Sequence, residues 1–337
     1  MTPIIDIHAH ALIPEVTHLV DGHAGFAAEQ DEQRRQFGAE SLEINARRFR
    51  EDWLGPLTDT DLRLSLMDES GVDIQVVSIS PTQYHYWADT ALARDIVATA
   101  NAGLAAVIDR APGRLAGLAT VSLQHPGLAA EQLEYAVTVL GMRGVQIGSA
   151  AGDHEFSHPA LDDFWATAAR LGALVFVHPW GRGPDGRLSS FYLGNIIGQP
   201  LETTIALAHL VFGGVLDRHP GLRVCGAHGG GYLPHYLGRA DHAYQARPES
   251  RTMSRPPSEY LDRFYFDSLV YTEDALRHLV AVAGADRVLL GSDYPFDMGV
   301  RDPVAKLAAL APVARAAIAG GNVVALLAPQ SVGGMDQ

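Results

Sequence analysis

The chain of 337 residues has little cysteine and little lysine, with one residue of each, Cys225 and Lys306. A single cysteine excludes an internal disulfide and is compatible with a cytoplasmic protein. A single lysine, on an expected surface helix, leaves little scope for Schiff-base chemistry. Acidic residues outnumber basic ones by 39 to 25, and the net charge of −14 disfavours nucleic acid or an anionic membrane as the main partner.

Three familiar sequence patterns are also missing. No apolar run of about 20 residues occurs, so we expect no membrane span. The first residues lack the basic and then apolar pattern of a signal peptide. No Gly-x-Gly-x-x-Gly motif or phosphate loop joins a strand to a helix, which disfavours dinucleotide and nucleoside-triphosphate enzymes.

Short apolar segments alternate with helical segments along the chain, and 47% of the residues are hydrophobic. Strands of this kind, each followed by a helix, indicate a parallel sheet with both faces covered. Eight such units predict an α/β fold, a (β/α)8 TIM barrel forming one domain over residues 1–330, with a doubly wound open sheet as the alternative. The predicted strands cover residues 3–10, 72–79, 115–123, 144–148, 173–178, 223–228, 264–270 and 288–293.

Two segments fall outside this alternation. Residues 11–57 show little periodicity, and a loop of this length in a compact domain is usually either functional or disordered. Because this segment follows the first strand, we expect an insertion that acts as a lid or binds the substrate. The polar, glycine-containing tail, residues 331–337, is expected to be disordered.

Histidines mark the ends of several predicted strands. His8 and His10 are two residues apart on the first strand, so their side chains point the same way. His178 and His228 end the fifth and sixth strands, and Asp293 ends the eighth. In a barrel these ends meet at one face, where catalytic groups lie. Imidazole and carboxylate ligands suit zinc and neighbouring transition metals, so the pattern predicts a catalytic metal site with an open position for water or substrate.

The motifs around these residues resemble those of the amidohydrolase superfamily, and more narrowly its decarboxylase branch, typified by 2-amino-3-carboxymuconate-6-semialdehyde decarboxylase. The similarity runs in order from residue 4 to about residue 325. The motifs that carry it are His8-Ala9-His10, His178-Pro179-Trp180, His228-Gly229-Gly230-Gly231 and Gly291-Ser292-Asp293-Tyr294-Pro295-Phe296.

The resemblance implies one divalent metal ion bound by His8, His10, His178 and Asp293. It also implies that His228 stays off the metal and exchanges a proton with the bound water, as catalytic acid and base beside Asp293. Related enzymes with Glu-x-His at the first strand often use manganese, so the His-x-His version here favours Zn²⁺, with Mn²⁺ as the alternative.

The resemblance further implies two substrate-binding arginines. Arg50 matches one in the insertion after the first strand, although an uncertain register leaves Arg48 open. Arg239 matches one that family members lend from a neighbouring subunit, which implies at least a homodimer. The planar guanidinium suits a carboxylate because it binds both oxygens. Trp180 is expected either to stack on a flat substrate or to pack at the barrel rim.

Other residues near the predicted site have expected supporting roles. Phe191 and Tyr192 follow the fifth strand and are candidates for the pocket wall. Asp6 and Ser292 flank predicted ligands, and we expect them to be buried groups that orient those ligands rather than catalysts.

The sequence therefore predicts metal-dependent, non-oxidative decarboxylation of an unsaturated or aromatic carboxylic acid. Metal-dependent hydrolysis or hydration of a related carboxylate or lactone would use the same groups and is the alternative. A non-catalytic barrel that binds a metal or ligand is the third hypothesis, and it would predict the loss of a ligand or of the acid/base. Neither is lost.

Overall fold

The computed structural model describes residues 2–180 and 186–328; the tail predicted to be disordered lies outside these ranges. The described residues form eight strands, and each pair of hydrogen-bonded strands is parallel. The strands are β1 (Ile5–Ala11), β2 (Ile74–Ile79), β3 (Leu115–Gly117), β4 (Gly144–Ile147), β5 (Leu174–Val177), β6 (Arg223–Gly226), β7 (Phe264–Asp267) and β8 (Val288–Leu289).

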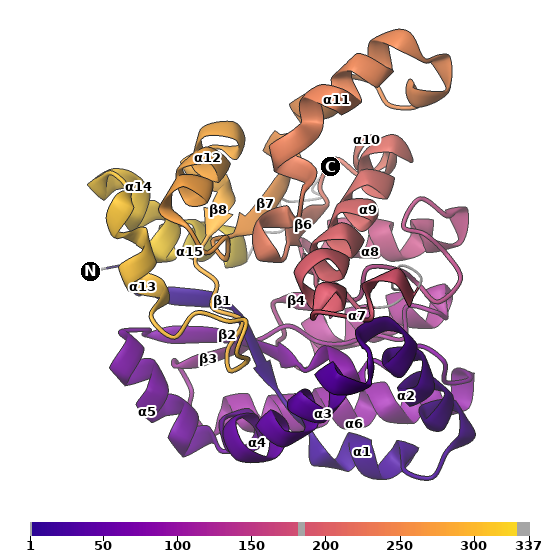
Figure 1. Cartoon of the computed structure of the whole chain (residues 1–337), viewed down its shortest axis with the longest axis vertical. Coiled ribbons are helices and arrows are strands. Elements are labelled where there is room, and N and C mark those ends of the chain that lie inside the picture. The colour runs from indigo at the N-terminus through magenta and orange to yellow at the C-terminus, as the bar shows by residue number, and fades with distance from the viewer. Residues whose placement is uncertain (1, 181–185, 329–337) are drawn as a thin grey trace, which may run out of the picture.

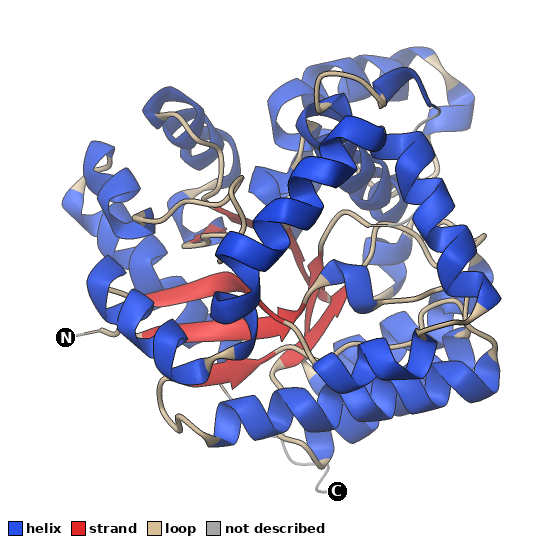
Figure 2. Ribbon diagram, turned by 60° about the horizontal axis from the view of Figure 1, so that its bottom comes forward, coloured by secondary structure: helices blue, strands red, loops and turns tan. Residues whose placement is uncertain are grey.

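Backbone hydrogen bonds beyond the regular strands close the sheet into a barrel. Ala119 pairs with the backbone of β4, with its N–H 2.9 Å from the Gly144 carbonyl, and this contact joins β3 to β4. The Ile7 N–H lies 2.8 Å from the Leu290 carbonyl, which joins β1 to the end of β8. Figure 2 shows the strands enclosed by helices. The predicted barrel is confirmed, and the open sheet is wrong.

The strands are shorter than predicted, most clearly the third. Residues 115–123 were expected to be strand, but β3 ends at Gly117; beyond it the Leu118 N–H donates to the Val77 carbonyl and Ala119 pairs with β4. Beyond Ala119 the chain leaves the ladder: the Thr120 backbone pairs with the Asn101 side chain, and the Ser122 N–H and hydroxyl donate to the Gln132 side chain.

A bulge in β1 turns the histidines into the barrel. The pairing of β1 with β2 shifts register between Asp6 and Ala9. Ile7 belongs to the apolar cluster that includes Phe176, and the adjacent His8 ring lies 4.9 Å from the Phe176 ring. Successive residues of a regular strand face opposite sides, so the bulge allows both side chains to reach this cluster.

Helices surround the barrel as expected from their apolar faces (Figure 1). Helix α5 (Thr60–Ser70) begins at Asp59, whose side chain accepts hydrogen bonds from two backbone N–H groups, and ends at left-handed Gly71. The other surrounding helices are α6 (Thr90–Asp109), α7 (Pro126–Thr138), α8 (Asp162–Leu171), α9 (Gln199–Phe212), α10 (Val215–Arg218), α11 (Leu233–Ala246), α12 (Glu273–Ala283), α13 (Pro303–Lys306), α14 (Pro312–Ala316) and α15 (Asn322–Leu327).

Helix α6 is long and apolar enough, by length and composition, to cross a membrane. In the structure it buries Ile96, Val97, Ala100 and Leu104 and contacts β2 and β3. Packing against the barrel therefore accounts for the apolar residues on the buried face of α6.

The insertion is helical, and the expectation of an irregular loop is wrong. It contains α1 (Pro14–Val20), α2 (Ala24–Phe37), α3 (Ala39–Arg48), a π-helical turn (Phe49–Trp53) and α4 (Leu54–Thr58). Every residue of α2 stays at least partly exposed. A helix with so little burial needs no apolar stripe, which is why its sequence shows no clear period.

Candidate active site

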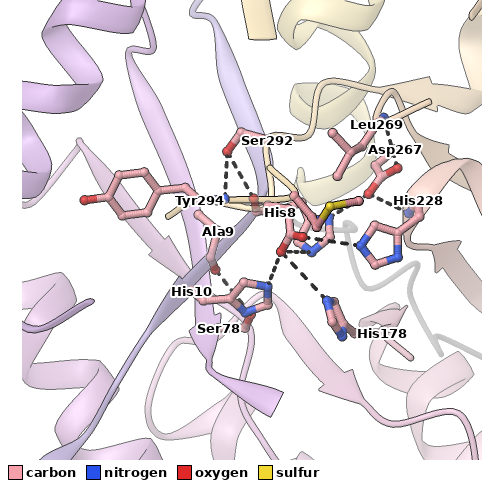
Figure 3. Close-up of polar contacts among 12 residues, drawn as sticks. His8, Ala9, His10, Ser78, His178, His228, Asp267, Leu269, Ser292 and Tyr294 are labelled. Carbon is pink, nitrogen blue, oxygen red and sulfur yellow. Dashed lines mark hydrogen bonds and ion pairs between the residues drawn. The ribbon is translucent and has the colours of Figure 1, made fainter. Parts of the chain in front are cut away.

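The four predicted metal ligands meet at the carboxyl-terminal mouth of the barrel. His8 and His10 project from β1, His178 directly follows β5, and Asp293 lies beyond β8. All four are buried, and their ligand atoms lie within 4.8 Å of one another. Figure 3 shows the histidine rings converging on one point.

Asp293 is the centre of this group. Its Oδ1 lies 3.1 Å from His10 Nε2, 3.3 Å from His8 Nε2 and 3.9 Å from His178 Nε2. Burial opposes ionisation of this carboxyl group. The charge on His8 and the hydrogen bond from His10 nevertheless hold the Asp293 pKa well below its usual value. The site therefore holds an ionised carboxylate ready to bind a cation.

The unpaired nitrogens in this group fit a metal ion. Within the described ranges, His8 Nε2 and both ring nitrogens of His178 are buried without a hydrogen-bond partner. Buried polar atoms are normally paired, so such orphans need an explanation. A cation bound by three imidazoles and Asp293 satisfies Nε2 of His8 and one His178 nitrogen, and this ligand set suits a divalent first-row metal.

The protonation of His8 supports the same conclusion. Burial alone would lower its pKa, but the charge of Asp293 and a hydrogen bond to Asp267 raise the pKa to about 10 in the metal-free protein. The two carboxylates thus draw a positive charge into the site. A metal ion bound at His8 Nε2 would take the place of that proton.

His228 approaches the site from β6 but is not part of the ligand group. Its Nε2 lies 3.5 Å from Asp293 Oδ2, its side chain is 13% exposed, and its Nδ1 is without a partner among the described residues. The structure thus brings the predicted acid/base to the edge of the metal site, where it faces the cavity.

The glycines after His228 shape this turn. His228 has φ of 52°, and the next three glycines have φ of 63°, 76° and 65°. Left-handed backbone is costly for residues with a side chain. A Cβ on Gly229 would also collide with Val270, and one on Gly231 with the Pro200 carbonyl. The run of glycines therefore lets the chain turn sharply and present the His228 ring to the cavity.

Asp6 and Ser292 are buried beneath the ligands, as predicted. Asp6 accepts hydrogen bonds from the Ser292 hydroxyl at 2.6 Å, from the His8 N–H at 3.0 Å and from Gln75 at 3.2 Å. Burial raises the Asp6 pKa to about 6. Arg63 donates to Gln75 at 2.9 Å and to the His10 carbonyl at 2.5 Å. This network fixes the backbone on both sides of the β1–β8 seam.

Asp267, Arg63 and Gln75 were not predicted from the sequence. Asp267 ends β7 and receives a hydrogen bond from His8 Nδ1 at 2.6 Å. Its place as an acidic residue at the end of an apolar strand was the one available signal. Arg63 and Gln75 lie within an ordinary helix and strand, and no sequence pattern distinguishes them from surface residues.

A cavity of about 1040 Å³ opens over the site. His178, His228 and Asp293 lie among its lining residues. The insertion supplies one side of the cavity, and several aromatic side chains lie in the wall. The aromatic lining residues are Phe37, Phe49, Trp53, Trp180, Tyr192, Tyr232, Tyr271 and Phe296. The space and its flat apolar walls suit a planar organic ligand.

The predicted substrate residues divide into two groups. Trp180 and Tyr192 line the cavity, and the Trp180 ring stacks on Phe37 with the centroids 6.4 Å apart. In contrast, Arg50 and Arg239 are exposed and lie outside the cavity lining of the described chain.

Two further observations concern the predicted pocket residues. Phe191 is 86% exposed. Arg48 pairs at 3.2 Å with Asp297, which lines the cavity. Arg34 also lines the cavity, although its position in a polar run of the sequence gave no reason to select it.

Comparison with known proteins agrees with this geometry. A protein-family model described as amidohydrolase matches residues 5–328. The 2-amino-3-carboxymuconate-6-semialdehyde decarboxylase of Dictyostelium discoideum is 35% identical over 274 residues, covering 80% of this chain and 76% of the relative. The gamma-resorcylate decarboxylase of Rhodococcus jostii is 30% identical, covering 70% of this chain and 77% of the relative.

Solved structures give the same result. The 5-carboxyvanillate decarboxylase of Sphingomonas paucimobilis superposes with a TM-score of 0.82 at 25% identity, covering 98% of this chain and all (100%) of that one. A dihydroxybenzoic acid decarboxylase of Polaromonas with bound manganese has a TM-score of 0.76 at 26% identity, with 97% of each chain covered. The family match spans nearly the whole chain and includes every residue of the metal group. The chain therefore belongs to the amidohydrolase family.

Proposed function

We propose that this protein is a metal-dependent, non-oxidative decarboxylase that acts on an unsaturated or aromatic carboxylic acid. The observation that carries the proposal is a buried four-ligand metal site with a fourth histidine, His228, beside it on an aromatic-walled cavity. The relatives described above, named as decarboxylases of such acids, support the reaction class.

The residues that would hold the metal are His8, His10, His178 and Asp293. Bound there, a divalent cation would supply a Lewis acid that orients the substrate and withdraws electron density from it. Three imidazole ligands favour Zn²⁺, whereas the Polaromonas relative binds manganese. Elemental analysis of purified protein distinguishes the two, with one zinc per chain expected.

His228 would carry out the proton transfer. When CO₂ leaves a carboxylate, the bonding electron pair stays on the carbon, which must then accept a proton. Protonated His228 can donate that proton from its place on the cavity wall and afterwards take another from solvent. Imidazole suits this role because it gains and loses a proton near neutral pH.

The cavity wall would select the substrate. Trp180 and Phe296 present flat faces on which an aromatic or conjugated acid can stack. The helical insertion, residues 11–57, would act as the lid, since its aromatic residues Phe37, Phe49 and Trp53 already face the cavity.

Two arginines would anchor carboxylate groups of the substrate. Arg50 lies in the π-helical turn after α3, next to Phe49, which lines the cavity. Arg239 lies on α11, which projects from the body of the molecule (Figure 1). Both are exposed in the single chain, so we propose that a second copy brings Arg239 to the partner's cavity in a homodimer. Arg239→Ala should then raise KM by about tenfold or more while kcat changes less. A location in the cytoplasm is consistent with the single cysteine.

A carbon dioxide release assay tests the proposed reaction. The panel should contain carboxymuconate semialdehydes and ring-hydroxylated benzoates, with metal-stripped protein and His228→Ala as controls. We expect CO₂ from at least one acid and its loss in both controls, by a factor of about 10² or more for the variant. A hydrolysed or hydrated product without CO₂ would replace this proposal with the hydrolase or hydratase alternative. Full turnover in stripped protein would contradict both.

A further inference from the structure

Asp267 is a fully buried carboxylate at the end of β7, outside the group of metal ligands. Its Oδ2 receives hydrogen bonds from His8 Nδ1 at 2.6 Å and from the His228 backbone N–H at 3.0 Å. Its Oδ1 receives hydrogen bonds from the Gly229 N–H at 2.7 Å and from the Leu269 N–H at 3.2 Å. One side chain therefore touches both the metal ligand of β1 and the turn that carries the proposed acid (Figure 3).

The contact with His8 determines which ring nitrogen faces the site. An ionised carboxylate can only accept hydrogen bonds, so His8 Nδ1 must carry a proton when it contacts Asp267. In the neutral ring this leaves the lone pair on Nε2, which points at Asp293 from 3.3 Å. A metal ligand needs that lone pair, and carboxylate partners of ligating histidines commonly fix it in this way.

The contact with the His228 turn determines where the acid lies. The N–H groups of His228 and Gly229 point together at Asp267 because both residues have left-handed backbone, with φ of 52° and 63°. Successive N–H groups in such a turn form a small concave site for an anion. Asp267 occupies it and thus holds the turn in the conformation that presents the His228 ring.

We propose that Asp267 is a positioning residue that sets the tautomer of His8 for metal binding and, through the same carboxylate, the position of His228 for proton transfer. The second half rests on the proposed function, whereas the first half concerns metal binding alone. Because Asp267 contacts both residues, the position of His228 would depend on the position of the metal ligand His8.

Asp267→Asn tests this because an amide cannot replace all four acceptor contacts. If its NH₂ faces His8, the ring must carry its proton on Nε2 and loses the lone pair for the metal. If the NH₂ faces the other way, it opposes the N–H groups of Gly229 and Leu269. We expect metal affinity, measured by competition with a chelator, to fall about 10- to 100-fold.

A double-mutant cycle separates positioning from a general loss of structure. In a His8→Ala background, Asp267→Asn should weaken metal binding less than about threefold, because the ring on which it acts is gone. An equal loss in both backgrounds would overturn the first half of the proposal. Asp6→Asn is the matched control, since Asp6 is an equally buried carboxylate whose described partners are backbone N–H groups, the Ser292 hydroxyl and the Gln75 amide rather than a ring nitrogen. It should weaken metal binding less than Asp267→Asn does; an equal effect counts against the proposal.

Kinetics at saturating metal test the second half. Asp267→Asn should lower kcat about 100-fold with KM within about threefold, and should lower it little further in a His228→Ala background. If Asp267→Asn lowers kcat by the same factor in the His228→Ala background as in wild type, the proposed role through His228 is wrong. Should the wild type release no CO₂, the proposed function fails while the metal-affinity cycle still decides the role at His8.

Should Asp267→Asn not fold, nitrogen-15 NMR of histidine-labelled, metal-loaded wild type remains decisive for the first half. His8 should show a proton on Nδ1 and none on Nε2. A proton on Nε2, or no proton on Nδ1, would overturn the proposal.

Discussion

Arg63 shows at the residue scale how much of the site depends on groups that are neither metal ligands nor part of the cavity lining. Its guanidinium is buried, donates to Gln75 and to the carbonyls of His10 and Pro56, and lies over the Tyr294 ring at 4.6 Å. Burial lowers the Arg63 pKa from its usual value. Among the described residues, this buried cation is stabilised by several hydrogen bonds and an aromatic face rather than by a directly contacting carboxylate.

Arg63→Lys should therefore destabilise the protein. An ammonium group lacks the planar fork that reaches Gln75 and the His10 carbonyl together, so a buried acceptor is left unpaired. The free energy of unfolding in urea should fall by about 1–3 kcal/mol. Arg277→Lys is the control, because Arg277 pairs with Glu273 and Asp274 on the exposed face of α12, and its effect should stay within about 0.5 kcal/mol. Equal effects of the two substitutions would mean that the buried network contributes nothing specific.

At the scale of elements, helix α2 is held to the barrel by few contacts. Glu29 on α2 accepts hydrogen bonds from His85 Nδ1 at 2.8 Å and from Trp87 Nε1 at 3.0 Å, both in the loop after β2. His23, which caps α2, stacks on Trp87 with the centroids 4.8 Å apart. A helix with so little burial is expected to open more readily than the barrel strands.

Glu29→Ala should release this helix. We expect faster hydrogen exchange across residues 24–37, with exchange in β5 and β6 unchanged, because opening of α2 does not require unfolding of the barrel. Glu32→Ala, on the same helix, removes only contacts to Arg35 and Gln36 within α2 and should have little effect. If Glu29→Ala leaves exchange in α2 as slow as in wild type, the link to His85 and Trp87 does not hold the helix.

The same elements explain what the sequence could and could not reveal. The strands were predictable because burial on both faces makes them apolar, and the five candidate site residues because they lie on or just after such strands. Strand position does not separate His228 from the four ligands; that assignment came from the family resemblance. Helix α2 was not, because a helix exposed on most sides carries no apolar stripe. The bulge in β1 and the role of Asp267 depend on pairing between segments distant in the chain, so no local pattern records them.

For the whole molecule, the metal site lies at the seam where the barrel closes. His8 and His10 belong to the first strand, Asp293 follows the last, and the Asp293 N–H donates to the His8 carbonyl at 2.9 Å. Strand β8 contributes only two residues, Val288–Leu289, to the ladder. A metal ion shared by His8, His10 and Asp293 would therefore link the two ends of the barrel, and its removal should lower the midpoint of thermal unfolding.

This stabilisation by metal should depend on pH in a defined direction. In the metal-free protein the His8 pKa is raised from 6.5 to about 10, since the pull of Asp293 and Asp267 outweighs burial. The proton on His8 thus stabilises the metal-free fold below about pH 6.5, and that contribution is lost as pH rises toward 10. A metal ion must displace this proton, so metal affinity should rise by up to about tenfold per pH unit between pH 7 and 9.

Competition with a chelator at several pH values measures this rise in metal affinity for wild type and for His8→Ala. The rise should be smaller in the variant, because it has no His8 proton for the metal to displace. Affinity independent of pH in the wild type would show that His8 is already neutral without the metal, and that the two carboxylates do not act on it as the geometry indicates.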